Sequence, residues 1–221
     1  MHIQVVVLTA PRPKKTLERT LRSLKKAGWE PGVDPSSEVG IYQDGASLGQ
    51  FRAYMEALRC TVHRHPKADA YSVVEDDVVF CRGLREYLER TLWPGPVEKI
   101  ALCSPYCPIA YRLRRWKGWH DSQSSQGLYL AGSQAWVFPP QAARAILAEV
   151  APLESPHGAD WEIGRWARAT RWRVWYHTPS LAQHVGLGNS ALGDNLVSDI
   201  RLAGDFVGED ANAMDLLGGL H

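Results

Sequence analysis

Hydrophobic residues in the first half of the chain form short continuous runs that alternate with stripes at helical spacing. Four runs predict strands buried on both faces, at residues 3–8, 39–42, 70–74 and 99–103. Between them, apolar residues recur every three or four positions and predict helices at residues 17–27, 48–62 and 84–92. Ser47 and Gln50 have the spacing of a capping box at the start of the second helix. Strands that alternate with helices favour an α/β fold with a parallel sheet.

The pattern is less regular after residue 103. Residues 104–127 are rich in Ser, Gln, Arg and Trp and are predicted as a long loop, while residues 128–138 are predicted as one or two strands. Helices are expected after residue 140 and after residue 158, and a late strand at residues 173–176. The last 28 residues hold six Asp or Glu against one Arg, and they are predicted as an acidic, mobile tail.

The amino-acid composition limits the class of protein and the compartment in which it works. Hydrophobic residues make up 45% of the 221 residues and charged residues 22%, which is typical of a globular protein with room for one good core. The net charge of +1 gives no general attraction to nucleic acid or membrane, and no apolar run is long enough for a membrane span. The N-terminus is interpreted as a first strand, not a signal peptide. Four scattered cysteines favour reduced thiols and a cytoplasmic protein.

Polar side chains follow each of the first three predicted strands. Thr9 and Arg12 follow the first strand, Asp44 follows the second, and residues 75–77 (Glu-Asp-Asp) follow the third. Ligands of open parallel sheets bind beyond the carboxyl ends of the strands, so we expect these side chains to converge. Thr9 and Arg12 could hold a nucleotide, and Asp44 could accept hydrogen bonds from a base or ribose. For Asp44 a simple turn is the alternative.

The acidic triplet interrupts an apolar run, "YSVVEDDVVF". Buried carboxylates usually find a cation or take up a proton. Mn²⁺ and Mg²⁺ prefer oxygen ligands, and Mg²⁺ often combines one or two protein carboxylates with substrate phosphates. Alternation along an extended chain points Glu75 and Asp77 to one side and Asp76 to the other. The triplet therefore predicts a divalent-metal site, with a solvated acidic turn as the alternative.

The order of segments resembles the GT-A glycosyltransferases, which use nucleotide-sugar donors. The resemblance covers about residues 3–193 and rests on these segments: "VVVLTAPRPKKTLERTLRSL", "YSVVEDDVVF", "GLYLAGSQAWVFPPQAARAIL", "GADWEIGRWA" and "PSLAQHVGLGNS". It implies a single-domain GT-A fold, a Rossmann-like mixed or mostly parallel sheet flanked by helices. The nucleotide-binding half would span about residues 1–103, the acceptor half about 104–193, and the tail 194–221.

The resemblance also implies roles for the acids. Asp77, the last acid of a DxD-type motif written here as EDD, would bind the metal directly, and Glu75 and Asp76 would lie near the ribose and sugar of the donor. GT-A enzymes often supply a second metal ligand late in the chain, which would be His184, since neutral imidazole suits Mn²⁺. A packed histidine is the alternative.

Two further segments acquire expected roles from the same resemblance. Asn189 and Ser190, in a glycine-rich stretch, would donate hydrogen bonds to the diphosphate. Asp160 opens a predicted helix, where an acid often only complements the helix dipole. In inverting GT-A enzymes a carboxylate at such a place acts as general base, so Asp160 is the expected base and Glu162 the reserve. The neighbouring Trp161 is predicted to contact the acceptor.

A basic and aromatic stretch lies in the predicted loop, at residues 111–120. Its Arg115 and Trp116 are predicted acceptor contacts, because aromatic rings stack on sugars or bases and guanidinium groups bind phosphates. A basic solvated loop is the alternative. A glycan is the default acceptor, and DNA with a hydroxymethylated base is the second.

These features predict a glycosyltransferase that uses Mn²⁺ or Mg²⁺, takes its sugar from a nucleotide-sugar donor, with a UDP-sugar the first candidate, and inverts the anomeric carbon. A glycosidase also uses paired carboxylates, but it does not explain the nucleotide-site layout. A sugar nucleotidyltransferase would need a glycine-rich loop after the first strand, where this chain has "TAPRPKK". A non-catalytic sugar- or nucleic-acid-binding module is the remaining alternative.

Overall fold

Two β-sheets organise the molecule, and they are described here from a computed structural model that covers residues 1–11, 14–32, 37–45, 48–108, 117–122, 130–186 and 202–219. The large sheet has seven strands: β1 (Ile3–Thr9), β2 (Val39–Gln43), β3 (Ala70–Glu75), β5 (Ile100–Ser104), β6 (Gly118–Asp121), β7 (Ala135–Phe138) and β8 (Arg173–Thr178). The small sheet pairs β4 (Val78–Phe80) with β9 (Ala182–His184).

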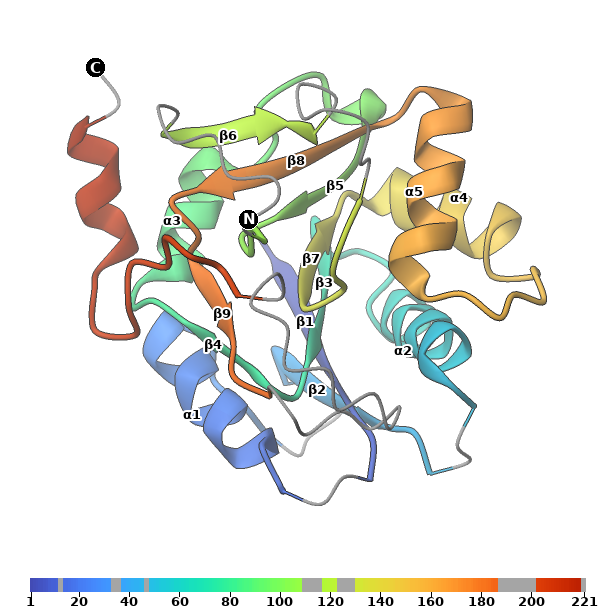
Figure 1. Ribbon diagram of the computed structural model, residues 1–221, viewed down its shortest axis with the longest axis horizontal. Helices are drawn as coiled ribbons and strands as arrows, with labels where there is room; N and C mark the ends of the chain where they lie inside the picture. The colour runs from blue at the N-terminus through green and yellow to red at the C-terminus, as the bar shows by residue number, and fades with distance from the viewer. Residues whose placement is uncertain are drawn as a thin grey trace.

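The large sheet is mostly parallel, in the order β2-β1-β3-β7-β5-β8-β6 (Figure 1). β1 is parallel to β2 and β3, and β5 is parallel to β8. β7 runs antiparallel to both of its neighbours, and β6 runs antiparallel to β8. The predicted fold class, a mostly parallel sheet flanked by helices, is confirmed. It follows from the continuous apolar runs of β1, β3 and β5, which are buried on both faces.

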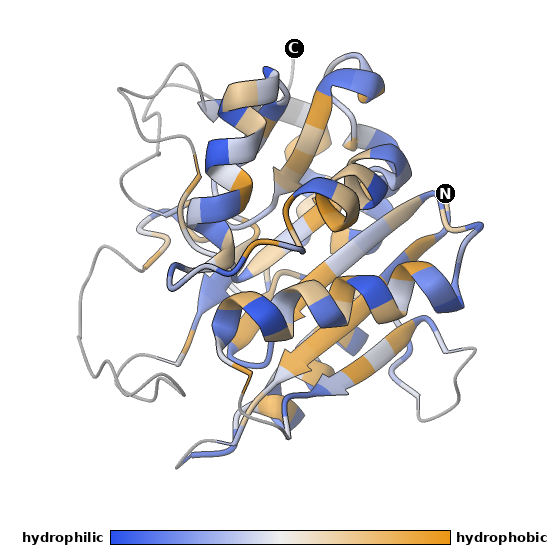
Figure 2. Cartoon of the chain, turned by 90° about the vertical axis from the view of Figure 1, so that its right-hand side faces the viewer, coloured by the Kyte–Doolittle hydropathy of each residue, from blue (hydrophilic) through white to orange (hydrophobic). Residues whose placement is uncertain are grey.

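Helices cover both faces of this sheet (Figure 1). One face carries α1 (Leu17–Ala27), α3 (Leu84–Thr91), the small sheet and a C-terminal 3-10 helix (Ala213–Gly219), and a short 3-10 turn at Val97–Lys99 precedes β5. The other face carries α2 (Gln50–Arg64), α4 (Pro140–Glu149) and α5 (Ala159–Thr170). Figure 2 shows the hydrophobic strands behind the mixed faces of these helices.

Alternate side chains of β1 enter different cores. Val5 and Val7 pack under α1 and α3, whereas Val6 and Leu8 pack under α2. Successive side chains of a strand point to opposite faces, so an unbroken apolar run fills two cores at once. None of the described helices combines the length and the apolar composition needed to cross a bilayer.

Three short strands and one helix start differ from the expectations. β6 lies inside the predicted loop at 104–127, and neither strand of the small sheet was predicted. α2 begins at Gln50 with Gly49 as N-cap at φ 84°, so the predicted helix start at residue 48 is wrong. Gln50 is therefore the first residue of the helix, and it cannot be the third residue of a capping box. Ser47 lies outside the described residues.

Candidate functional site

The small sheet brings His184 to the acidic triplet. β4 begins directly after Asp77, and its first residue, Val78, is the register partner of His184 in β9. His184 Nε2 lies 3.2 Å from Asp77 Oδ2, and only 7% and 5% of the two side chains are exposed. The structure thus joins two residues that are 107 positions apart in the chain.

The backbone after β9 packs tightly on the Asp77 carboxylate. The Val185 amide donates to the Asp77 carbonyl at 2.8 Å. A Cβ at Gly186 would lie 2.1 Å from Asp77 Oδ2, a distance that real Cβ atoms do not reach. Only glycine leaves the backbone this close, so position 186 is restricted by the carboxylate that it covers.

Asp77 and His184 form a two-residue set that could hold a divalent cation. Within the described parts of the chain, no group of three or more His, Cys, Asp or Glu side chains has the arrangement of a metal site. Two ligands bound at about 2.1 Å and at right angles to one ion lie about 3 Å apart, close to the separation of Asp77 Oδ2 and His184 Nε2. A carboxylate oxygen and an imidazole nitrogen suit Mn²⁺, and Mg²⁺ or Mn²⁺ commonly completes its shell with phosphate oxygens and water.

Thr9 and Asp76 close the ends of β1 and β3. Thr9 Oγ1 donates to Asp76 Oδ2 at 2.5 Å, and the Asp76 amide donates to the Leu8 carbonyl. Asp44, at the end of β2, donates its amide to the Thr9 carbonyl at 2.8 Å and accepts from the Leu48 amide through Oδ1. One Asp44 oxygen therefore closes a turn before α2. This is the simple turn that was given as the alternative role for Asp44.

Glu75 is connected to the start of α5 by a chain of hydrogen bonds. Ser133 Oγ, just before β7, donates to Glu75 Oε1 at 2.5 Å and accepts from Gln50 Nε2 at 2.7 Å. Gln50 Oε1 in turn accepts from the Ala159 amide at 2.8 Å. The end of β3, the start of α2 and the start of α5 therefore meet through side chains.

Asp160 lies in the first turn of α5, beside this chain of hydrogen bonds. Its Oδ2 accepts from the Gly132 amide at 3.1 Å, and its Oδ1 accepts from the Trp161 amide at 2.9 Å. Exposed N–H groups at a helix start stabilise a carboxylate there. Trp161 is 56% exposed and its ring packs on His157, so part of this aromatic side chain is open to a ligand.

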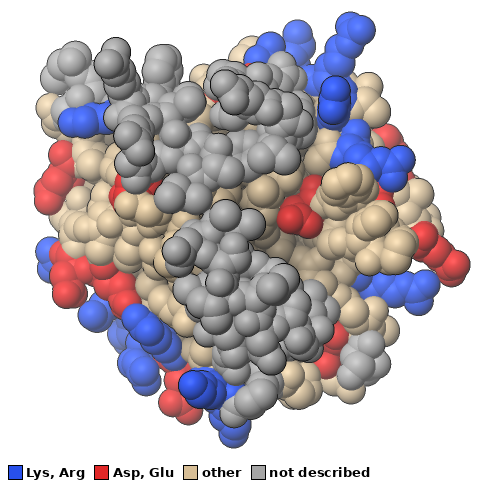
Figure 3. Space-filling model, in the orientation of Figure 1, with Lys and Arg blue, Asp and Glu red and all other residues tan. Residues whose placement is uncertain are grey.

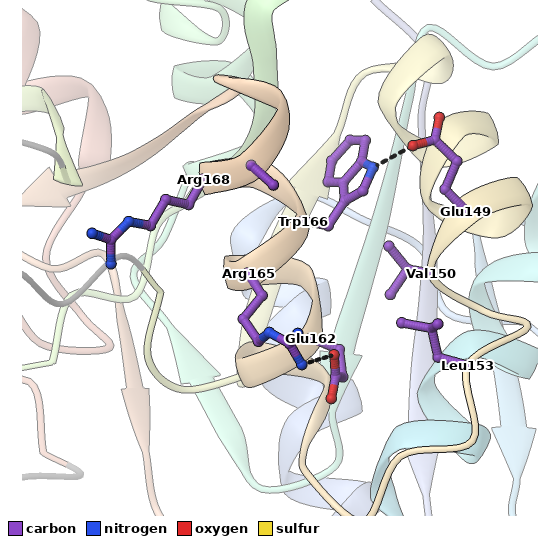
Figure 4. Close-up of a pocket in the computed structure, with 8 residues that line it drawn as sticks. Glu149, Val150, Leu153, Glu162, Arg165, Trp166 and Arg168 are labelled. Carbon is purple, nitrogen blue, oxygen red and sulfur yellow. Dashed lines mark hydrogen bonds and ion pairs between the residues drawn. The ribbon is translucent and has the colours of Figure 1, made fainter.

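Glu162 occupies a different place (Figure 4). Two positions along a helix correspond to about 200°, which turns Glu162 away from Asp160. Glu162 is 4% exposed, and its carboxylate accepts from Ser155 Oγ and pairs with Arg165. It lines a surface pocket of about 640 Å³ between α4 and α5, together with Trp166 and Leu153.

Five expected site residues lie outside the described residues: Arg12, Arg115, Trp116, Asn189 and Ser190. Sequence reasoning missed Gln50, Ser133 and Gly132 as site residues. A signal for two of them was present, since residues 132–134 (Gly-Ser-Gln) interrupt the apolar run "YLAGSQAWVF" just before a buried strand. Gln50 carried no signal beyond a helix start.

Charges of both signs are interspersed over the described surface in Figure 3, and neither sign dominates among the residues that the structure describes there. Lys and Arg alternate with Asp and Glu over α1, where Arg19 pairs with Glu209 and Lys26 with Asp210. The described part of this face therefore shows no uniform basic surface of the kind that holds nucleic acid through phosphates alone.

Known structures share this fold. No family model matches the chain, and no curated protein matches its sequence. The protein A197 from STIV superposes with a TM-score of 0.50 and 13% identity, over 82% of this chain and 85% of that chain. The mannosyltransferase PcManGT from Pyrobaculum calidifontis, in complex with GDP-Man and Mn²⁺, superposes with a TM-score of 0.51 and 13% identity, over 80% of this chain and 57% of that chain. At these identities the similarity establishes the fold.

Proposed function

We propose that this protein is a metal-dependent glycosyltransferase that moves a sugar from a nucleoside-diphosphate sugar to an acceptor hydroxyl, with inversion at the anomeric carbon. The observation that carries the proposal is the 3.2 Å approach of His184 Nε2 to Asp77 Oδ2 at the carboxyl edge of a parallel sheet. Ligands of such sheets bind at this edge, and a carboxylate with an imidazole suits a cation that also binds phosphates.

Donor-side roles fall to residues at the ends of β1 and β3. Asp77 and His184 would hold Mn²⁺ or Mg²⁺, which when bound neutralises charge on the diphosphate leaving group. Glu75 and the Thr9–Asp76 pair border the same edge and would contact the ribose or sugar of the donor. The mannosyltransferase of the same fold was solved with GDP-Man and Mn²⁺, so both UDP-sugars and GDP-sugars are candidate donors.

Asp160 would act on the acceptor. Its carboxylate takes the proton of the acceptor hydroxyl, whose oxygen forms the new bond to the anomeric carbon. The bond from that carbon to the diphosphate oxygen breaks, and the nucleoside diphosphate leaves with the electron pair. Trp161, largely exposed in the same helical turn, offers an aromatic face to a sugar ring, so a glycan is the proposed acceptor.

A thermal-shift panel of nucleoside diphosphates, UDP-sugars and GDP-mannose, with and without Mn²⁺, tests the donor site. A ligand at about 100 times its Kd stabilises the folded state by about 2.7 kcal/mol, which is readily seen as a rise in Tm. We expect a rise that needs Mn²⁺ and that Asp77→Asn removes. Asp69→Asn, at the other end of β3 and exposed, is the matched control. If no nucleotide raises Tm with Mn²⁺ present, the proposal fails.

Release of a nucleoside diphosphate together with a glycosylated acceptor tests the reaction itself. A glycosidase would cleave a simple glycoside and release no nucleotide. A binding module would show the Mn²⁺-dependent shift but no product. A hydroxymethylated DNA acceptor would show binding that weakens steeply with salt, since each neutralised phosphate adds about one unit to the salt slope.

A further inference from the structure

We propose that Gln50 is a positioning residue that holds the donor-side acid Glu75 and the acceptor-side acid Asp160 in one hydrogen-bonded unit. The inference rests on the proposed function, since it concerns how the two sides of that reaction are aligned. Its second component is Ser133, which connects Gln50 to Glu75.

Gln50 reaches both sides because of where its helix begins. As the first residue of α2, it stands at the helix start, and both ends of its amide are used. Nε2 donates to Ser133 Oγ at 2.7 Å, and Oε1 accepts from the Ala159 amide at 2.8 Å. An amide offers a donor and an acceptor on one rigid plane, so it fixes the distance between these two partners.

The hydrogen-bond partners of Gln50 lie next to, or bind directly, the two acids Glu75 and Asp160. Ser133 donates to Glu75 Oε1, and the amide of the preceding Gly132 donates to Asp160 Oδ2. Ala159 directly precedes Asp160 on α5. A shift of Gln50 would therefore move Glu75 through Ser133 and Asp160 through the start of the helix.

The packing leaves little freedom around this unit. A Cβ at Gly158 would lie 2.7 Å from Asp160 Oδ1 and 3.1 Å from Gln50 Oε1, so the backbone before α5 lies against both side chains. Tyr54, one turn after Gln50, is fully buried, and within the described structure its hydroxyl has no hydrogen-bond partner. Burial, and then the charges of Glu75 and Asp160, raise the pKa of Tyr54 well above its usual value.

Tyr54 therefore stays neutral, and its buried ring lies close enough to the two acids for their charges to act on it. Hydrogen bonds that are linked in a chain polarise one another, and the bonds that connect Glu75 to Ala159 are linked in this way and part-buried. In catalysis, a misplacement of about 1 Å costs about 100-fold in rate. The predicted effect of breaking the unit lies in alignment, with donor affinity preserved.

Gln50→Leu removes both hydrogen bonds at nearly constant volume. We expect kcat to fall about 10- to 100-fold while KM for the nucleotide sugar stays within about threefold. Gln141→Leu is the matched control, since Gln141 also stands at a helix start and donates to a backbone carbonyl, but in α4. A fall in Gln50→Leu no larger than in Gln141→Leu would overturn the inference.

Ser133→Ala breaks the same chain of hydrogen bonds at a second place. If Gln50 and Ser133 act as one unit, each single variant loses about as much kcat as the double variant, because the first break already uncouples the acids. Losses that multiply in Gln50→Leu/Ser133→Ala would show two independent contributions and would contradict the proposal. A variant that fails to fold is recognised by its Tm, and the other variant then carries the comparison.

A readout without turnover separates this inference from the proposed function. In the amide NMR spectrum, Glu75→Gln should shift the Ala159 resonance in the wild-type background and leave it unchanged in the Gln50→Leu background. The inference would be overturned if Glu75→Gln shifted the Ala159 resonance equally in both backgrounds, or in neither. If no nucleotide sugar is turned over by the wild type, the proposed function fails, and this spectrum still decides whether Gln50 couples the two sides.

Discussion

Gly186 shows how one residue can determine the geometry of the Asp77–His184 pair. We expect Gly186→Ala to weaken Mn²⁺ binding and to lower the free energy of unfolding by about 1–3 kcal/mol, because its Cβ would collide with the Asp77 carboxylate. Mn²⁺ titration and urea unfolding measure the two effects. Gly218→Ala, where a Cβ meets nothing within 4 Å, is the control. Unchanged Mn²⁺ affinity in Gly186→Ala would show that Gly186 does not control the geometry of the Asp77–His184 pair.

The proposed role of Asp160 as general base is tested by replacing its carboxylate with an amide. In Asp160→Asn we expect kcat to fall by a factor of about 10²–10⁴, because the amide cannot accept the hydroxyl proton. Donor binding, read from the nucleotide-dependent rise in Tm, should persist. Near-normal turnover in this variant would remove Asp160 from the scheme.

Glu162→Gln tests the reserve base. Glu162 lines the pocket between α4 and α5, and its carboxylate accepts from Ser155 Oγ and pairs with Arg165. We therefore expect Glu162→Gln to affect stability more than turnover, the reverse of Asp160→Asn. Loss of turnover in Glu162→Gln alone would transfer the role of base to Glu162.

For single residues, the sequence predicted the acidic residues of the candidate site but not the residues that hydrogen-bond to them. The placement of Thr9, Asp44 and the acidic triplet followed from topology alone, because carboxyl ends of parallel strands share one edge. The approach of His184 to Asp77 was expected only through the family resemblance. Gln50 was not predictable, because its role depends on a helix that starts two residues later than the pattern indicates.

At the scale of elements, α3 and β8 are joined by a buried pair, Tyr87 and His177. His177 Nδ1 faces the Pro179 carbonyl at 2.7 Å, which can only accept, so Nδ1 carries the proton and Nε2 accepts from the Tyr87 hydroxyl at 2.7 Å. Burial lowers the pKa of His177 to about 4, and the Pro179 hydrogen bond offsets only part of this. The neutral ring is therefore the folded form.

This pair predicts how stability depends on pH. Between about pH 6.5 and 4, His177 binds a proton in the unfolded chain, where its pKa is near 6.5, but not in the folded chain. The free energy of unfolding therefore falls as the pH drops through this window. Between pH 7 and 5 this amounts to about 2 kcal/mol. Urea unfolding should show that loss in the wild type and a smaller one in His177→Gln. The exposed His63→Gln should behave as wild type, and equal losses in all three would contradict the assignment.

The elements that the sequence predicted are those whose pattern is strong and long. β1, β3 and β5 are continuous apolar runs, and α1 and α3 show clear helical spacing. β4, β6 and β9 have three or four residues each, too few for a period to emerge, and β9 reads Ala-Gln-His. Their pairing is set by long-range contacts, so local sequence carries little information on them.

At the scale of the whole molecule, the C-terminal segment 202–219 braces the small sheet. The Arg82 amide donates to the Ala211 carbonyl, and the Ala213 amide donates to the Arg82 carbonyl. The Gln183 side chain binds both the amide and the carbonyl of Ala203. These contacts fall just beyond β4 and inside β9, the two strands that set Asp77 beside His184.

Deletion of residues 202–221 should therefore disturb the Asp77–His184 pair from a distance. Loss of buried Ala203 and Ala213 and of the packed Phe206 and Leu217 exposes the core under α1 and α3, which we expect to cost on the order of 3–5 kcal/mol. The truncated chain should bind Mn²⁺ more weakly, because β9 loses its brace. Hydrogen exchange should show faster exchange in β9 than in the central strand β3, and Gln183→Leu should give a milder form of the same change. Undiminished Mn²⁺ affinity and protection of β9 in the truncated chain would mean that the small sheet holds His184 against Asp77 by itself.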